Sequence, residues 1–205
     1  MIFGLNTLKQ MALNEIVYPH DLPAEWCIDY YSNEFSLLQL YLSDFPLINT
    51  SDEKNISSLA KCLETINNDL DDHYILFDVS ELTARQQQQL FNIPAISDNY
   101  YAFINLALLQ GEYLSELALT LQWGDLLQTA DNGKILVDKS SCFCSIMGEQ
   151  RLTPFELRKL IELLQKKARQ RDCQQLLVTF PVQLSGVENC RNAILLESMM
   201  SVSPA

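Results

Sequence analysis

The sequence lacks the features that take a protein into or across a membrane. It has no run of about 18 apolar residues, and it has no basic n-region followed by the apolar h-region of a signal peptide. We therefore expect a soluble, cytoplasmic protein with no membrane partner. Basic residues are also scarce, because 14 Lys and Arg stand against 26 Asp and Glu, for a net charge of −12. Phosphate backbones are bound by concentrated Lys and Arg, so this balance argues against nucleic acid as a partner.

Histidines and closely paired cysteines are equally sparse. His20 and His73 are the only histidines, and their placement fits neither a zinc site nor a facial triad. The six cysteines form no Cys-x-x-Cys pair, and most lie within apolar or helical patterns. In a reducing compartment this indicates free thiols and not a disulfide framework. Cys142 and Cys144 would share one face of a strand, as packed small hydrophobes or, alternatively, as a redox or metal pair. We expect no cofactor and no metal.

Glycine is missing where a nucleotide-binding loop would need it. Gly4 lies in the first apolar run, and the residues from Leu5 to Gln10 contain no further glycine. A dinucleotide-binding sheet carries a glycine-rich turn directly after its first strand, because the backbone must approach the phosphates closely. The sequence therefore argues against that class of fold.

What the chain does contain is an alternation of strand and helix patterns. Its 205 residues fit one domain, residues 1–205, which is large enough to bury a sizeable core. The clearest helix start is at Thr153, an N-cap residue followed by Pro154 and completed by Glu156 as a capping box. Apolar residues then recur at the spacing of one buried face to about Gln170. The cations on the other face predict a solvated surface, with a nucleic-acid patch as the alternative.

Seven strands are predicted, near residues 2–6, 37–42, 74–79, 101–107, 134–138, 142–147 and 175–180. Helices are predicted over residues 23–33, 56–70, 81–91, 112–129, 153–170 and 189–200. Because the strands are apolar throughout and alternate with helices, the pattern predicts an α/β fold with a parallel sheet covered by helices. Periodicity alone leaves two geometries, an open doubly wound sheet and a closed barrel.

A set of short motifs recurs in a recognisable order along the chain. It comprises Gly4, Tyr18-Pro19, Leu22-Pro23, Trp26, Tyr30-Tyr31, Phe35, Leu136-Val137-Asp138, Gly148, Phe180 and Asn192-Ala193. This ordered set resembles the YecE-like family (domain of unknown function 72), and the chain looks like a shortened and divergent member. The resemblance implies a TIM-barrel-like (β/α) fold, whose reactive groups would lie at the C-terminal ends of the strands.

The chain departs from the family pattern at those strand ends. The positions that carry polar residues in the family correspond here to Gln39, Tyr41, residues 105–108, residues 145–148 and residues 180–182, and most are apolar or small. The resemblance thus implies that the fold is retained, while the catalytic groups at the C-terminal ends of the strands have been lost. A TIM barrel typically takes about 250 residues, and the third βα unit has no counterpart here. We expect a barrel trimmed to about seven strands and incompletely closed, whose exposed edge could be covered by a second copy in a homodimer.

Polar residues near the predicted strand ends are the only candidate catalytic groups. They are Asp78, Asn105, Asp138 and Glu149, with Asp44 as a further carboxylate. Carboxylates that meet at a barrel mouth could bind Mg²⁺ or divide acid and base roles, whereas separate ones cap helices or pair with cations.

Two functions follow from these alternatives. The favoured one is a non-catalytic or weakly active YecE-like remnant that binds a protein partner or a small ligand. The other is a small hydrolase or metal-dependent enzyme that uses the mouth carboxylates. An open polar mouth would favour the enzyme, and a mouth plugged by side chains such as Met147 and Leu108 would favour the remnant. His20 is expected in a surface loop.

Overall fold

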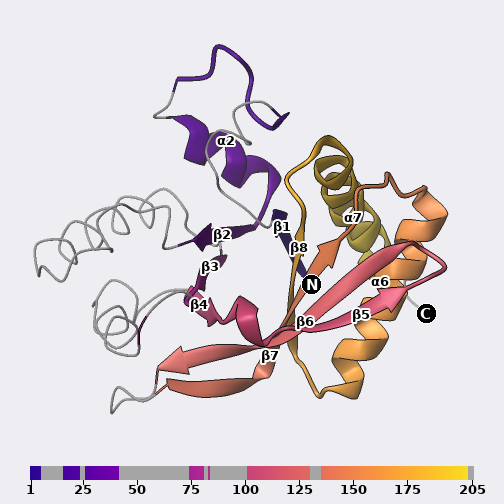
Figure 1. Ribbon diagram of the computed structural model, residues 1–205. Coiled ribbons are helices and arrows are strands. Elements are labelled where there is room, and N and C mark those ends of the chain that lie inside the picture. Colours follow the sequence, from indigo (N-terminus) through magenta and orange to yellow (C-terminus); the bar gives the residue numbers. More distant parts are fainter. Residues whose placement is uncertain are drawn as a thin grey trace, which may run out of the picture.

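The computed structural model describes residues 1–5, 16–23, 26–41, 74–80, 83, 101–129 and 135–202. The helices predicted over 56–70 and 81–91 lie outside these residues, as do Asp44, Cys62 and His73. The fold within them is mixed α/β, with one curled sheet and three α-helices (Figure 1).

Eight strands form the sheet, in the order β4-β3-β2-β1-β8-β7-β6-β5. They are β1 (Ile2–Leu5), β2 (Leu37–Tyr41), β3 (Tyr74–Asp78), β4 (Tyr101–Ile104), β5 (Gln110–Leu114), β6 (Leu119–Thr129), β7 (Ile135–Met147) and β8 (Gln175–Phe180). The neighbours from β4 through β1 and β8 to β7 are parallel, whereas β6 pairs with β7 and β5 in antiparallel register. The prediction of a wholly parallel sheet is therefore wrong for β5 and β6.

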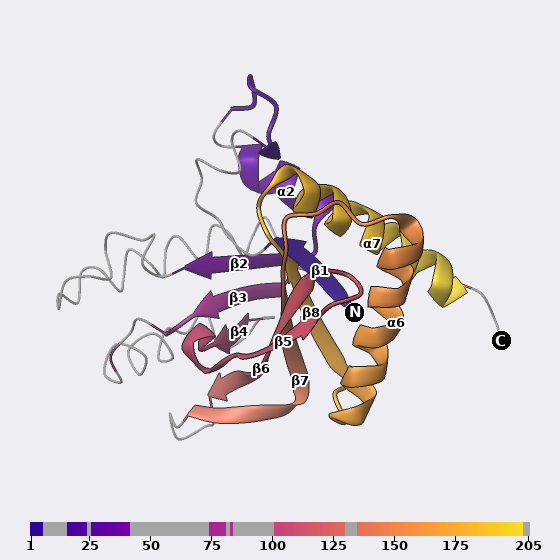
Figure 2. The same ribbon diagram turned by 45° about the vertical axis from the view of Figure 1, so that its right-hand side comes forward.

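The sheet curls until β4 approaches β6 from the other side. The two strands join through one antiparallel residue pair, Phe103 with Leu127. One such pair does not make a continuous hydrogen-bonded wall, so the architecture is a curled, open half-barrel (Figure 2). The barrel-like α/β character predicted from the sequence is confirmed at this level.

The region from Glu112 to Thr129, predicted as a helix, is instead the hairpin of β5 and β6. Leu119, Leu121 and Trp123 are buried while the residues between them are half-buried, which is the period-two pattern of a strand. The apolar residues of this region also satisfy helical spacing, so the period was misassigned. The predicted strands 134–138 and 142–147 are likewise one strand, β7.

The helices α6 (Pro154–Gln170) and α7 (Leu184–Val202) lie side by side on the outer face of the sheet (Figures 1 and 2). The capping box predicted for α6 is confirmed: Glu156 N donates to Thr153 Oγ1 at 3.3 Å, and Thr153 N donates to Glu156 Oε2 at 2.8 Å. The shorter α2 (Cys27–Glu34) is tied to α7 by an ion pair between Glu34 and Arg191 at 2.6 Å. None of the described helices is long and apolar enough to cross a membrane.

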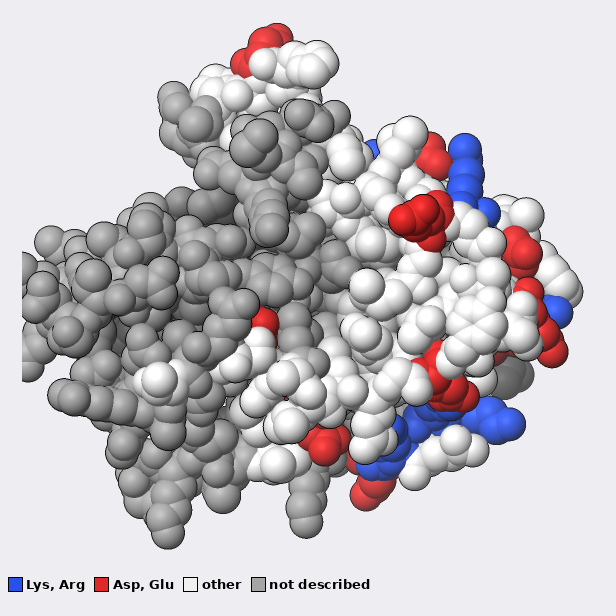
Figure 3. All heavy atoms as spheres, viewed as in Figure 1, with Lys and Arg blue, Asp and Glu red and all other residues white. Residues whose placement is uncertain are grey.

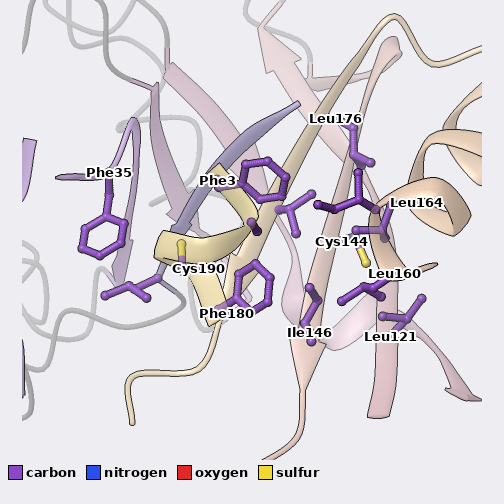
Figure 4. Close-up of a cluster of buried hydrophobic side chains, with 14 of the residues drawn as sticks. Phe3, Phe35, Leu121, Cys144, Ile146, Leu160, Leu164, Leu176, Phe180 and Cys190 are labelled. Atoms are coloured by element: carbon purple, nitrogen blue, oxygen red, sulfur yellow. The ribbon is translucent and has the colours of Figure 1, made fainter. Parts of the chain in front are cut away.

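Alternate residues of each strand serve two separate apolar clusters. The larger one fills the space between the sheet and the helices (Figure 4), and includes Phe3, Cys144, Leu160, Leu176 and Phe180. The smaller one lies on the inner face of the curled sheet and consists of Leu37, Leu76, Ile104, Leu126, Phe143 and Leu177, each at most 2% exposed. We call these six residues the apolar floor. The inner face of the half-barrel is thus a packed interior.

The cysteines contradict the prediction of free thiols in one place. Cys142 of β7 and Cys173, which follows α6, form a disulfide across 31 residues of chain. Their pairing follows from register, because Cys142 lies opposite Leu176 at the start of β8, three residues after Cys173. Cys27, Cys144 and Cys190 are buried and form no disulfide, and burial raises the pKa of the Cys144 and Cys190 thiols well above the usual value.

Candidate functional site

Above the apolar floor, toward the C-terminal ends of the strands, the inner face changes from apolar to polar. Four of the polar residues lie two positions after a floor residue of the same strand, so their side chains point to the same side as the floor. The fifth, Gln122 of the antiparallel β6, faces that side because it pairs with Ser145. The polar residues are Gln39, Asp78, Gln122, Ser145 and Thr179. We call these five residues the polar layer. Gln39, Asp78, Ser145 and Thr179 are buried, with exposed fractions of 1%, 8%, 4% and 0%.

The strand register brings members of the polar layer next to one another. Gln122 lies opposite Ser145, and Ser145 lies opposite Thr179 on the neighbouring strand. Side chains opposite each other on adjacent strands are about 5 Å apart at Cβ. Three polar side chains from β6, β7 and β8 therefore form one continuous row.

Gly4 continues this row toward β2, where the next residue is Leu37 of the apolar floor and not Gln39. Gly4 lies opposite Thr179 on one side and Leu37 on the other. A Cβ at Gly4 would stand 1.9 Å from the carbonyl oxygen of Leu37, so only glycine permits this approach of β1 to β2. Tyr31 spans the same two strands, since its hydroxyl accepts from Leu5 N at 3.1 Å and donates to Leu37 O at 2.8 Å. Burial raises the pKa of this hydroxyl far above its usual value.

Two oxygens of the polar layer have no hydrogen-bond partner among the described residues. They are Gln39 Oε1 and Thr179 Oγ1, and both are inaccessible to solvent. Within the described part of the chain the Ser145 hydroxyl makes one weak contact, at 3.8 Å from Met147 Sδ. An unpaired buried polar atom costs about 1–3 kcal/mol, so a fold rarely keeps one without a ligand, an ordered water or another use for it. A third such atom, Trp123 Nε1, faces the helices beneath the Arg171 guanidinium and lies outside the polar layer.

The loop after β7 forms a fixed wall beside the polar layer. Side chains around the start of α7 hold three of its residues: Gln183 Nε2 donates to Gly148 O at 2.7 Å, Ser185 Oγ donates to Glu149 O at 2.7 Å, and Asn189 Nδ2 donates to Gln150 O at 3.0 Å. Asn189 also accepts from Leu152 N at 2.9 Å. Asn189 is buried, so its bonds to this loop are shielded from water. Backbone carbonyls and amides that are satisfied in this way hold the loop in one conformation.

The structure brings two of the sequence-predicted site residues to neighbouring strand ends. Asp78 ends β3 opposite Ile104, and Asn105 follows directly after Ile104. Each is turned into its own loop: Asp78 accepts from Ser80 N at 3.0 Å and Ser80 Oγ at 2.8 Å, and Asn105 Oδ1 accepts from Ala107 N at 3.1 Å. Asn105 opens a short 3₁₀ helix, η3 (Leu106–Leu108), where the sequence predicted a continuing strand.

The other two predicted residues lie elsewhere. Asp138 is inside β7, before the point where Ser141 pairs with the first residue of β8, and so lies at the opposite end of the sheet from Asp78. Burial raises its pKa, but hydrogen bonds from Ser140 and Ser141 outweigh this and leave the pKa below its usual value. Glu149 is exposed on the loop after β7. Within the described part of the chain, no three His, Cys, Asp or Glu side chains gather into a group that could hold a metal.

Met147 and Leu108 do not plug the interior, because they are 41% and 72% exposed, so the plugged mouth that would favour the remnant is not formed by these two side chains. His20 is also exposed, in agreement with a surface loop.

Three of the six cations predicted on the outer face of α6 pair with acids. Lys167 pairs with Glu112, Arg171 with Asp125 at 4.0 Å, and Arg158 with Glu162 at 2.9 Å. In Figure 3, Lys and Arg spheres adjoin acidic ones along this part of the surface.

Comparisons with protein-family models, with curated proteins and with solved structures give no match. The resemblance to the YecE-like family therefore stays a prediction, and the site rests on its own geometry.

Thr179 was not among the sequence-predicted residues, and Gln39 and Ser145 were interpreted only as signs of loss. Thr179 lies in the apolar run Gln175–Phe180, where one hydroxyl residue before a strand end looks like an ordinary β-branched strand residue. The sequence does contain a signal for these residues, because Gln39, Ser145 and Thr179 all lie at inward-facing positions of a strand near its C-terminal end. Which positions face inward can be recognised only when the strand register is known.

Proposed function

We propose that this protein is a YecE-like barrel remnant, non-catalytic or weakly active, that binds a small ligand at the polar layer. One observation carries the proposal: Gln39 Oε1 and Thr179 Oγ1 are buried, face the inner side of the sheet and have no partner among the described residues. A ligand that hydrogen-bonds these oxygens would remove the cost of leaving them unpaired, and the interior must open to admit it because both oxygens are inaccessible to solvent. Their position at the C-terminal ends of parallel strands is where α/β sheets and barrels bind their ligands.

The surroundings of the polar layer support binding over catalysis. The loop of residues 148–152 is held by Gln183, Ser185 and Asn189, so this part of the surroundings is already ordered. Catalysis would need an acid, base or nucleophile among these groups. The only ionisable member of the polar layer is Asp78, which is occupied by Ser80.

The alternative, a small hydrolase or metal-dependent enzyme, would use Asp78, Asn105, Asp138 and Glu149. The adjacency of Asp78 and Asn105 favours it, and the separation of Asp138 from both disfavours it. A protein partner or a homodimer remains a further prediction, and the end strand β5 is the edge that supports it. Nucleic acid remains disfavoured by the net charge and the paired cations of α6.

Ligand-observed NMR with a defined mixture of small sugars, polyols, carboxylates, phosphates and amines tests the proposal. Wild-type protein should give saturation-transfer signals from at least one compound, and the signals should disappear in Gln39→Leu and Thr179→Val. Gln170→Leu is a matched control, because Gln170 is exposed on α6 and far from the polar layer. Absence of signals with the wild type, or signals that persist in both interior variants, would refute ligand binding at this position.

Asp78→Asn separates the two functions. We expect it to leave ligand binding intact, since an amide oxygen can still accept from Ser80. If a hydrolytic activity is found and Asp78→Asn abolishes it without loss of fold, the enzyme alternative is correct.

A further inference from the structure

Positive charge is concentrated on α6 and on the residues at its two ends. Residues 151–171 contain seven of the chain's 14 Lys and Arg, but only two of its 26 Asp and Glu. Salt screens exposed charges that are more than about 8 Å apart at physiological ionic strength. A molecule that touches α6 would therefore meet this local excess of positive charge, although the net charge of the whole chain is −12.

The cations in the second half of α6 divide into two groups by their contacts. Lys167 and Arg171 turn toward the hairpin of β5 and β6, where each pairs with an acid. Lys166 and Arg169 are exposed, and neither forms an ion pair with another described residue. The hairpin thus uses one pair of cations, and the other pair remains available to an anionic group from outside.

The available cations belong to a continuous exposed face of the helix. This face, which we call the α6 stripe, consists of Phe155, Lys159, Glu162, Lys166 and Arg169. Their spacing of i, i+4, i+7, i+11 and i+14 is that of the face on which a second helix packs. At the N-terminal end of the stripe the Phe155 ring is 67% exposed, with Lys159 Nζ 4.8 Å from its centroid. The stripe therefore presents an apolar ring at one end and two cations at the other.

The C-terminal half of the α6 stripe borders a shallow, open groove of about 440 Å³. Its lining among the described residues is Glu162, Gln165, Lys166, Arg169 and Gln170. The glutamine amides can donate and accept hydrogen bonds, and the long stems of Lys and Arg offer apolar surface below their charges. At about 1.5 Å per residue, Phe155 lies about 16–21 Å along the helix from the two cations. A helical segment of about 15 residues is long enough to contact both ends.

We propose that the α6 stripe is the docking surface for an acidic helical segment of a partner protein. Carboxylates of the segment pair with Lys166 and Arg169, and an apolar side chain of the segment covers Phe155. Charge complementarity carries this choice of partner. A nucleic acid fits less well, because Glu162 lies between the cations and would face a phosphate, whereas a peptide can place a neutral residue there. The proposal is independent of ligand binding at the polar layer.

Fluorescence anisotropy with labelled probes tests the proposal. The main probe is a helical peptide of about 18 residues, built on Ala, with Leu near one end and Glu 11 and 14 positions further along. The comparison probes are the same peptide with Gln in place of both Glu, and a single-stranded DNA of about 18 nucleotides. We expect saturable binding of the Glu peptide at low salt with a Kd below about 1 mM, and much weaker binding of the Gln peptide.

Two variants and one control locate the binding. Lys166→Gln combined with Arg169→Gln should weaken the Glu peptide by at least about fivefold, and Phe155→Ala should weaken it by about threefold. Arg151→Gln combined with Arg191→Gln is the control, because it removes the same charge from positions outside the α6 stripe. We expect the control to bind the peptide as the wild type does. Circular dichroism checks that each variant is folded.

Three results would overturn the proposal. The first is an absence of saturable binding by the Glu peptide, or equal binding of the Gln peptide. The second is tighter binding of the DNA than of the Glu peptide, with a loss in the Lys166→Gln, Arg169→Gln variant, which would make nucleic acid the partner. The third is self-association of the wild type in analytical ultracentrifugation at low salt that this variant abolishes, which would make a second copy of the chain the occupant.

Discussion

Replacement of Thr179 by Val is the sharpest perturbation that the structure offers. The hydroxyl is fully buried and without a described partner, so the folded protein pays its desolvation without compensation. Val keeps the shape, the branched Cβ and the strand preference of Thr while it replaces the hydroxyl by a methyl group. The change therefore removes an unfavourable term and adds apolar contact beside Leu177 and Phe143.

The expected size follows from the cost of an unpaired buried polar group. That cost is about 1–3 kcal/mol, so Thr179→Val should raise the free energy of unfolding of the ligand-free protein by about 1–2 kcal/mol. For a domain of this length the melting temperature should rise by about 2–4 °C per kcal/mol. Most core substitutions destabilise, so a gain of this size is diagnostic.

Urea unfolding followed by tryptophan fluorescence measures the effect, with Trp123 as a buried reporter in β6. Thr179→Ser is the matched control, because it keeps the hydroxyl and removes only the methyl group. We expect Thr179→Ser to destabilise slightly and Thr179→Val to stabilise. A loss of about 1 kcal/mol or more in Thr179→Val would show that the hydroxyl is hydrogen-bonded in the folded protein, and the argument for a binding site would lose its basis.

Further predictions concern the frame around the site. Thr153→Ala should lower the free energy of unfolding by about 1 kcal/mol in urea titrations, because α6 loses its N-cap; an unchanged midpoint would contradict this. Asn189→Leu should cost about 2–3 kcal/mol and speed amide exchange at Leu152, since the loop after β7 loses two bonds; unchanged exchange would count against a fixed wall. The lowered pKa of Asp138 means that its carboxylate stabilises the fold above its unfolded-state pKa, and this contribution is lost as the pH falls through the folded-state value. Asp138→Asn should therefore weaken the pH dependence of the melting temperature below about pH 4, and an identical acid profile would refute this role. Peptide mapping without reduction should recover Cys142 linked to Cys173, whereas full alkylation of both would exclude the disulfide.

Much of the framework could be predicted from local patterns. The α6 start was predictable because Thr153, Pro154 and Glu156 act within one turn of the chain. The strands β1, β2, β3 and β8 were predictable because they are short apolar runs with clear ends. These features depend on residues that are close in sequence, so they can be recognised without knowledge of the fold.

The errors arose where the deciding contacts are distant in sequence. The region of β5 and β6 contains apolar residues that fit both periods, and its pairing with β7 across the following turn selects the strand. The disulfide of Cys142 and Cys173 depends on the register of β7 against β8. The site was misjudged for the same reason, because Gln39, Ser145 and Thr179 look like isolated polar residues until the curl of the sheet brings their strands together.

The most direct test of the account is a crystal structure of the protein with the compound of the NMR mixture that binds most tightly. We predict ordered ligand density within hydrogen-bond distance of Gln39 Oε1 and Thr179 Oγ1. A structure in which these two oxygens are bonded to other side chains of the protein, with the compound bound elsewhere, would contradict the central claim.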